Sequence, residues 1–108
     1  MLRYLTVPVT PFQQNCSIVW CNATGQAAVI DPGGDLDMLL AEIQRLGLTL
    51  SQIWLTHAHI DHAGGTAELA KRLQLPIIGP HPGDQFWIDG LPQQSDMFGF
   101  PHADVFKP

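Results

Sequence analysis

Three histidines and one aspartate stand within six consecutive residues, in the segment HAHIDH at positions 57–62. Neutral imidazole nitrogen and carboxylate oxygen are the ligands that zinc and similar divalent ions take in proteins. A single histidine in a surface loop would carry no such meaning, but spacing this tight leaves few purely structural reasons for the cluster. The segment therefore predicts a metal site whose ligands are His57, His59, Asp61 and His62.

The strand expected before this cluster determines which of its side chains can share an ion. Residues 51–56 have strand composition, and in an extended chain residues two apart project to the same side. His57 and His59 can therefore bind one ion together. Two glycines follow the cluster and indicate that the chain turns there, and a turning chain can direct Asp61 and His62 at a second ion beside the first.

The segment 57–62 resembles the signature of the metallo-β-lactamase superfamily, and Asp31, in the sequence VIDPGG, resembles the aspartate that this family carries upstream at a strand end. Residues 14–16 and 76–79 make the sequence most similar to the small bacterial glyoxalase-II-like hydrolases. The resemblance extends from about Leu5 to the end of the chain. It implies an α/β (α+β) fold of the αββα type, in which two sheets pack face to face between outer helices.

The resemblance also implies a role for each ligand of the cluster. The first two histidines of the family motif, here His57 and His59, bind one metal ion. Asp61 and His62 bind the other, and Asp61 is the candidate catalytic carboxylate. The implied cofactor is a pair of zinc ions, with iron or manganese as alternatives, and a bridging hydroxide attacks a carbonyl. The implied substrate is a small molecule, first of all a thioester such as an acyl-glutathione, while amides, phosphodiesters and lactones stay open.

Asp31 has two interpretations. An aspartate between an apolar strand and Pro-Gly-Gly commonly accepts backbone N–H bonds of the turn. The family resemblance adds a second role, because the strands before Asp31 and before the cluster would end side by side. There its carboxylate can accept the ring N–H of a ligand histidine or hold the ligand segment in place. We expect this positioning role, and no direct bond from Asp31 to a metal.

The sequence departs from the family after the first cluster. Family members complete the site with a further histidine, a metal-bridging aspartate and a last histidine, and no later part of this sequence resembles those motifs. The later histidines are His81, which lies in PHPG and reads as a loop residue, and His102 near the end. We therefore expect residues 1–108 to be the first half of one metallo-β-lactamase domain without an internal boundary. That half would supply one mixed sheet with helices on one face.

An uncovered sheet face leads to two alternatives for the chain as a whole. An apolar face of several hundred Å² is unusual on a soluble monomer. We expect either a fragment whose C-terminal half is missing or a half that pairs with a second copy as a homodimer. The alternative to a hydrolase is accordingly a metal-binding, self-associating half-domain without turnover. Four ligands divided between two ions leave each ion with two, fewer than the three of catalytic zinc sites.

Composition argues against several other partners and sites. The net charge is −5 with neutral histidines, and the five lysines and arginines are scattered, so no basic stripe marks a nucleic-acid interface. No apolar run has the length of a transmembrane helix, and we expect no signal peptide and no membrane partner. Cys16 and Cys21 stand five residues apart on one expected strand, so they face opposite sides and cannot bridge. A reduced, cytoplasmic protein is the simplest interpretation.

Apolar patterns predict the secondary structure around these motifs. Three short strands in succession indicate an antiparallel meander, and a leucine-rich helix follows with Asp35 as its N-cap and Gly47 as its stop. A second helix follows the cluster and should turn Ala67, Ala70 and Leu73 inward. The expected strands are residues 2–9, 15–21, 26–31, 53–56 and 76–79, and the expected helices are residues 35–46 and 66–74.

The sequence after Pro80 shows no periodicity and predicts a long loop. Its aromatic residues stand among glycines and prolines. Two interpretations are open: the rings anchor the loop to the surface, which we favour, or they form a lip that lines the substrate site. The residues concerned are Phe86, Trp87, Phe98 and Phe100.

Overall fold

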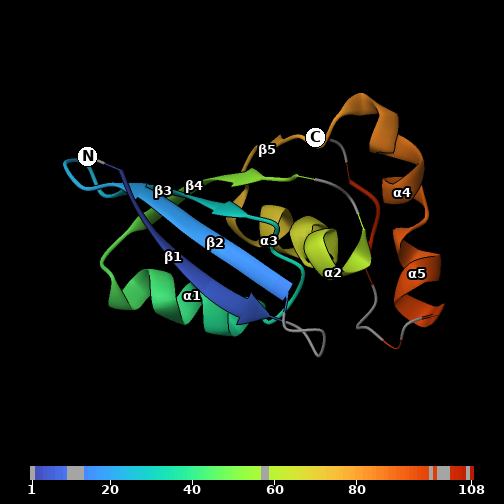
Figure 1. The fold of residues 1–108 in the computed structure, drawn as a ribbon, viewed down its shortest axis with the longest axis horizontal. Coiled ribbons are helices and arrows are strands. Elements are labelled where there is room, and N and C mark those ends of the chain that lie inside the picture. The colour runs from blue at the N-terminus through green and yellow to red at the C-terminus, as the bar shows by residue number, and fades with distance from the viewer. Residues whose placement is uncertain (1, 10–13, 57–58, 98, 100–102, 107) are drawn as a thin grey trace.

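The computed structural model of the chain describes residues 2–9, 14–56, 59–97, 99, 103–106 and 108 (Figure 1). Four residues with predicted roles, His57, Phe98, Phe100 and His102, lie outside this description, as does the side chain of Asp61. No helix within the described ranges is long and apolar enough to cross a membrane.

Five strands form one mixed sheet in the order of the sequence. The first three pair antiparallel, which confirms the predicted meander, and the last two join by parallel pairing. Each parallel connection passes through a helix, as parallel neighbours require. The strands are β1 (Leu2–Val9), β2 (Gln14–Cys21), β3 (Gln26–Ile30), β4 (Thr49–Trp54) and β5 (Ile77–Ile78).

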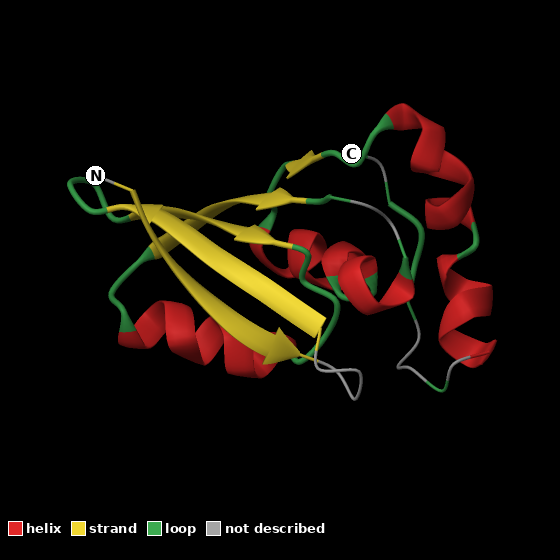
Figure 2. Cartoon of the chain, in the orientation of Figure 1, coloured by secondary structure: helices red, strands yellow, loops and turns green. Residues whose placement is uncertain are grey.

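Helices follow β3, β4 and β5 (Figure 2). The first helix has Asp35 at the predicted N-cap position and ends before Gly47, whose φ of +70° lies in the left-handed region. Of the other helices, α2 begins within the histidine cluster and the rest begin after it. The helices are α1 (Leu36–Arg45), α2 (Ile60–Ala63), α3 (Thr66–Leu73), the short 3-10 helix η1 (Pro82–Asp84), α4 (Gln85–Asp89) and α5 (Leu91–Met97).

One face of the sheet is covered by α1 and α3 and forms the main core (Figure 1). Directly paired residues of neighbouring strands point to the same side, and Ile18, Val29 and Ile53 are paired in this way. All three are fully buried, with Leu39 of α1 and Leu69 of α3 against them. The predicted α+β architecture, a mixed sheet with helices on one face, is confirmed for this part of the chain.

The opposite face of the sheet, which we call the open face, carries exposed apolar side chains. Trp54 pairs with Ile78, and both are exposed, by 38% and 51% respectively. Tyr4 and Leu2, near the other edge, are three-quarters exposed or more. The indole Nε1 of Trp54 donates to Gln52 Oε1 at 2.7 Å, so its polar atom is satisfied while its ring is left to solvent.

The structure corrects several predicted element boundaries. Strand β4 spans Thr49–Trp54 and not residues 53–56; the N–H of Leu55 still donates to Ile78 O, but the N–H of Thr56 donates to the side chain of Asp31 and not to a neighbouring strand. Strand β5 keeps only two of four predicted residues. Leu73 is 42% exposed and does not face inward as predicted. It ends α3, and Leu75, just beyond the helix, packs against the core in its place.

The prediction of a long loop after Pro80 is wrong, because this segment forms η1, α4 and α5. Ile88 of α4 and Leu91 of α5 are fully buried, in a second core with Leu55, Ile60 and Ala63. The helices have five and seven residues, too few turns for a repeating pattern to stand out. Trp87 packs against the second core, whereas Phe86 is 62% exposed and its ring lies 4.6 Å from that of Trp87.

Candidate metal site

The candidate ligands lie where the chain leaves the carboxyl end of β4. His59 occupies the N-cap position of α2 and has an extended backbone, with φ −68° and ψ 151°. Its side chain is exposed, while that of His62, on the same short helix, is half-buried. Asp61 belongs to α2 as well, but only its backbone is described. A short helix thus begins within the cluster, and the expected turn follows it at residues 64 and 65.

Asp31 contacts both flanks of the cluster. It follows β3, which pairs with β4 at its end, and its own N–H donates to Trp54 O at 2.9 Å. Its carboxylate accepts from the backbone N–H of Thr56 at 2.8 Å and from the Thr56 hydroxyl at 2.6 Å. The second oxygen also lies 3.1 Å from His62 Nδ1. One buried carboxylate thus joins the residue before the cluster to its last histidine.

The contact between Asp31 and His62 selects one tautomer of the imidazole. A carboxylate accepts hydrogen bonds, so the hydrogen between the two groups belongs to Nδ1 of His62. In that tautomer Nε2 carries the lone pair that a metal ion requires. The left-handed backbone of Asp31, with φ +57°, directs the carboxylate toward the cluster.

The two glycines after the cluster permit a close backbone approach. A β-carbon on Gly64 would lie 2.7 Å from the carbonyl oxygen of Gly33, and one on Gly65 would lie 2.7 Å from that of Pro32. The N–H of Gly65 donates to Pro32 O at 2.9 Å. The predicted turn is present at both glycines, and their negative φ shows that the turn itself does not require glycine. They are needed because the ligand helix presses on the turn after Asp31.

The family model of the metallo-β-lactamase superfamily matches residues 9–108. The chain belongs to this superfamily. It is 42% identical over 102 residues to the hydroxyacylglutathione hydrolase GloC of Haemophilus influenzae, covering 94% of this chain and 48% of the relative. It is 31% identical to the probable metallo-hydrolase YqgX of Bacillus subtilis, covering 81% of this chain and 40% of that protein.

Solved structures of the superfamily share the fold. The crystal structure of TTHA1623 in a di-iron-bound form has a TM-score of 0.83 and 34% identity, covering 96% of this chain and 51% of that one. The B3 metallo-β-lactamase BLEG-1 has a TM-score of 0.80 and 28% identity, covering 96% and 50%. The chain thus spans about half the length of these proteins.

The candidate ligands are of the chemical types that bind divalent metal ions, which proteins of this superfamily use. Imidazoles and a carboxylate are ligands of zinc and iron, and His62 has the carboxylate on its other ring nitrogen that metal-bound histidines commonly have. Among the described side chains no three histidine, cysteine, aspartate or glutamate groups converge on one point. His57 and the Asp61 side chain are outside that description, so the set of four ligands stays a prediction.

Other residues considered as ligands have different surroundings. Both cysteines are free, and Cys16 is buried in the main core, where burial and the nearby Asp31 charge raise the pKa of its thiol to about 12. A thiol held protonated in this way does not bind a metal as thiolate. His81 precedes η1, and its Nδ1 accepts from the N–H of Gly83 at 2.9 Å, as expected of a loop residue.

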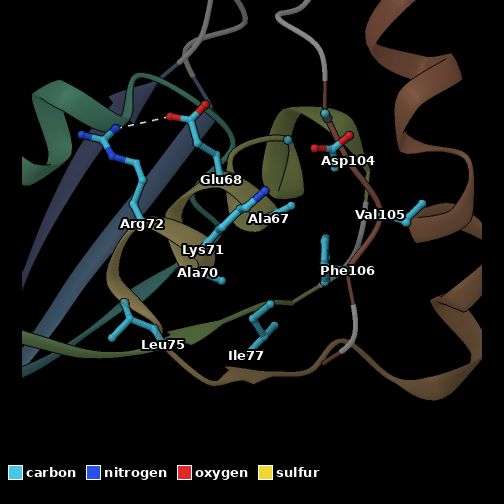
Figure 3. A pocket seen from close by; sticks show the side chains of 12 residues that line it. Ala67, Glu68, Ala70, Lys71, Arg72, Leu75, Ile77, Asp104, Val105 and Phe106 are labelled. Carbon is cyan, nitrogen blue, oxygen red and sulfur yellow. Dashed lines mark hydrogen bonds and ion pairs between the residues drawn. The ribbon is translucent and has the colours of Figure 1, made fainter.

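A cavity of about 860 Å³ lies between α3 and residues 103–106 (Figure 3). Lys71 and Glu68 of α3 line it opposite Asp104 and Phe106. The described residues around it include neither His59 nor His62, so this cavity is separate from the candidate metal site.

Sequence reasoning missed two residues that contact the site. Thr56 gives its N–H and its hydroxyl to Asp31, and a threonine directly before the histidine cluster could have suggested such a contact. Gln94, on α5, accepts from the N–H of Ile60 through its side-chain oxygen at 3.3 Å. It is separated from the cluster by more than thirty residues, and no sequence pattern connects the two.

Proposed function

We propose that this chain carries the first metal ligands of a glyoxalase-II-like metal-dependent hydrolase that acts on thioesters such as an acyl-glutathione. The observation that carries the proposal is the buried carboxylate of Asp31, in contact with Thr56 and with His62 Nδ1. A shared carboxylate of this kind fixes a histidine as a metal ligand. Similarity to a hydroxyacylglutathione hydrolase supports the substrate class.

Each side chain has a definite task in this proposal. His57 and His59 would hold one ion, and Asp61 and His62 the other. A metal pair, zinc or in its place iron or manganese, supplies when bound a hydroxide at neutral pH and polarises the substrate carbonyl. Asp31 keeps the hydrogen on His62 Nδ1, so Nε2 of the same ring keeps the lone pair with which it would bind a metal ion. The Asp31 contacts to Thr56 hold the start of the ligand segment against β3.

Replacement of Asp31 by Asn tests the proposal directly. An amide has one acceptor oxygen where the carboxylate has two, so it loses either the bond from the Thr56 N–H or the bonds from the Thr56 hydroxyl and His62, and zinc affinity should fall about 10- to 100-fold. Competition with a chromophoric chelator measures this affinity. The matched control is Asp96→Asn, an exposed carboxylate on α5, which should leave it unchanged. Equal affinity of the Asp31 variant and the parent would contradict the proposed metal site.

Turnover provides the second test. The 108-residue chain should show at most trace thioester hydrolysis, because the family site needs further ligands downstream. A protein extended through those motifs should release thiol from an acyl-glutathione in a metal-dependent manner. Robust metal-dependent turnover by the short chain, with its length verified by mass spectrometry, would contradict this expectation.

A second candidate function is a metal-binding half-domain that self-associates and has no turnover, and the open face favours it. Exposed Tyr4, Trp54 and Ile78 on one face are suited to a second copy or to a C-terminal half. Sedimentation and binding of a hydrophobic dye report association, and elemental analysis of the associated state separates the candidates. About two ions per chain supports a completed two-metal site, whereas fractional occupancy supports the half-domain.

A further inference from the structure

The two short helices α4 and α5 lie against the segment that carries the candidate ligands (Figures 1 and 2). Ile88 and Leu91, one from each helix, share the second core with Ile60 and Ala63 of α2. These four side chains are fully or nearly fully buried. The ligand helix, which has only four residues, therefore packs its apolar side chains against α4 and α5 as well as against Leu55 and Ala103 of the same core.

A polar contact joins α5 to the first residue of the ligand helix. The side-chain oxygen of Gln94 accepts from the N–H of Ile60 at 3.3 Å, and this N–H directly follows His59. The first N–H groups of a helix have no partner within the helix, so a side chain from elsewhere can satisfy them. The amide nitrogen of Gln94 in turn lies 3.5 Å from Trp87 O, which connects the contact to α4.

An aromatic contact joins α4 to a candidate ligand itself. The ring of Trp87 lies edge to face against the imidazole of His59, with centroids 4.6 Å apart and planes at 84°. This is the favoured geometry for a pair of aromatic rings. Trp87 is half-buried against the second core, so it is itself held in place, while His59 is exposed. A fixed ring beside an exposed one limits the orientations that the exposed ring can take.

We propose that Trp87 and Gln94 are positioning residues of the metal site: Trp87 orients the imidazole of His59, and Gln94 fixes the backbone directly after it. The inference deepens the proposed function and depends on it. Neither residue needs to touch metal or substrate for this role. The contact of Trp87 with His59 gives the segment after Pro80 a task that is neither surface anchoring nor substrate lining.

Paired substitutions separate positioning from general structure. At position 87, Trp87→Leu removes the aromatic ring and Trp87→Phe keeps an aromatic ring. At position 94, Gln94→Leu removes the hydrogen-bond acceptor and Gln94→Glu keeps an acceptor oxygen. The matched control is Gln93→Leu, the exposed neighbour on α5. We expect both leucine variants at 87 and 94 to weaken zinc affinity of the chain about tenfold, and the conservative variants to restore most of it. Chelator competition measures the affinity, and circular dichroism verifies the fold.

Two further measurements make the outcome decisive. In the metal-free chain, Gln94→Leu should speed hydrogen exchange at the Ile60 amide, and Gln93→Leu should not. In a chain with His59→Ala, the Trp87→Leu change should have no further effect on zinc affinity, because the ring it positions is absent.

The result identifies which proposal fails. Zinc binding by the parent with equal affinity in the leucine variants, or equal losses in the Gln93 control, would overturn the positioning role and leave the proposed function intact. Absence of zinc binding by the parent would overturn the proposed function, and the positioning role with it. A loss that the conservative variants do not restore would mean that the two residues serve only the fold.

Discussion

The ligand segment is held from two sides, and the two sides use different forces. On the β3 side, Asp31 makes three polar contacts of 2.6 to 3.1 Å, and the N–H of Gly65, two residues after the ligand helix, donates to Pro32 O. On the α4–α5 side, apolar packing dominates, with one aromatic edge and a longer hydrogen bond from Gln94. The polar side holds the ligand segment through short hydrogen bonds, and the apolar side buries the side chains of Ile60 and Ala63.

Both sides matter only if the segment between them binds the metal. Replacing His57 and His59 together by Ala should therefore abolish specific zinc retention, the largest effect that we expect. Elemental analysis of the purified variant and parent measures it. A melt that stays unchanged would show that the loss is one of ligands and not of fold. Unchanged zinc content would place the site elsewhere in the chain.

The apolar side is tested by Leu91→Ala. Leu91 is fully buried in the second core, so its truncation leaves a cavity and should lower the free energy of unfolding by about 2–5 kcal/mol. Urea unfolding measures this change. Met97→Ala, at an exposed position on the same helix, is the control and should cost far less. A small loss at Leu91 would mean that α4 and α5 contribute little to the stability of the ligand helix.

The polar side is tested by Gly65→Ala. The added β-carbon would lie 2.7 Å from Pro32 O, so either the ligand helix or the Asp31 turn must move, at a cost of about 1–3 kcal/mol. Gly90→Ala is the matched control, because its nearest contact would be an ordinary 3.4 Å and its φ of −90° suits alanine. Urea midpoints compare the two variants. Equal stability of both would show that the approach at Gly65 is looser than described.

A last effect concerns pH and the thiol of Cys16, which lies in the main core near Asp31. The pKa of the Cys16 thiol is raised from 9.0 to about 12, first by burial and second by the Asp31 charge. Above pH 9 the unfolded chain loses this proton before the folded one does. Stability that is fully present below pH 9 should therefore fall toward pH 12, by about 1.4 kcal/mol per pH unit.

A comparison of variants isolates this pH effect from other groups that titrate in the alkaline range. Cys16→Ala should remove the extra fall of stability with rising pH. Cys21→Ala should keep this fall and make it steeper, because a hydrogen bond with Thr24 lowers the pKa of the Cys21 thiol in the folded chain and opposes the fall. Urea unfolding at several pH values between 8 and 10.5, a range within about one and a half units of the unfolded thiol's pKa, measures the slopes. The same slope in all three proteins would mean that Cys16 does not carry the effect.

The two sides also differ in how far the sequence predicted them. The strands and the α1 stripe follow from local patterns of alternation and helical spacing, and the position of Asp31 beside the cluster is what the family resemblance implied. The α4–α5 side depends on contacts such as Trp87 with His59, between residues far apart in the chain. Its helices are too short for a periodic signal, and the pairing of distant residues is set by tertiary packing alone.

Glycine and threonine at the site illustrate a further limit. Gly64 and Gly65 predicted a turn, which the structure contains, but they also permit a close approach to the segment after Asp31 that no local pattern indicates. Thr56 read as the end of a strand, and it lies beyond the strand as a donor to Asp31. In each case the residue type is informative, but its partner lies about thirty residues away and is known only from the fold.

The open face has an optical consequence. The chain contains three tryptophans, and each lies in a different region: Trp20 packs against the main core, Trp87 lies beside His59, and Trp54 is exposed on the open face. Indole emission moves to shorter wavelength when water is removed from the ring. With Trp20 and Trp87 replaced by Phe, the emission maximum of Trp54 would move to shorter wavelength when another surface covers this face, and no added label would be needed to detect it.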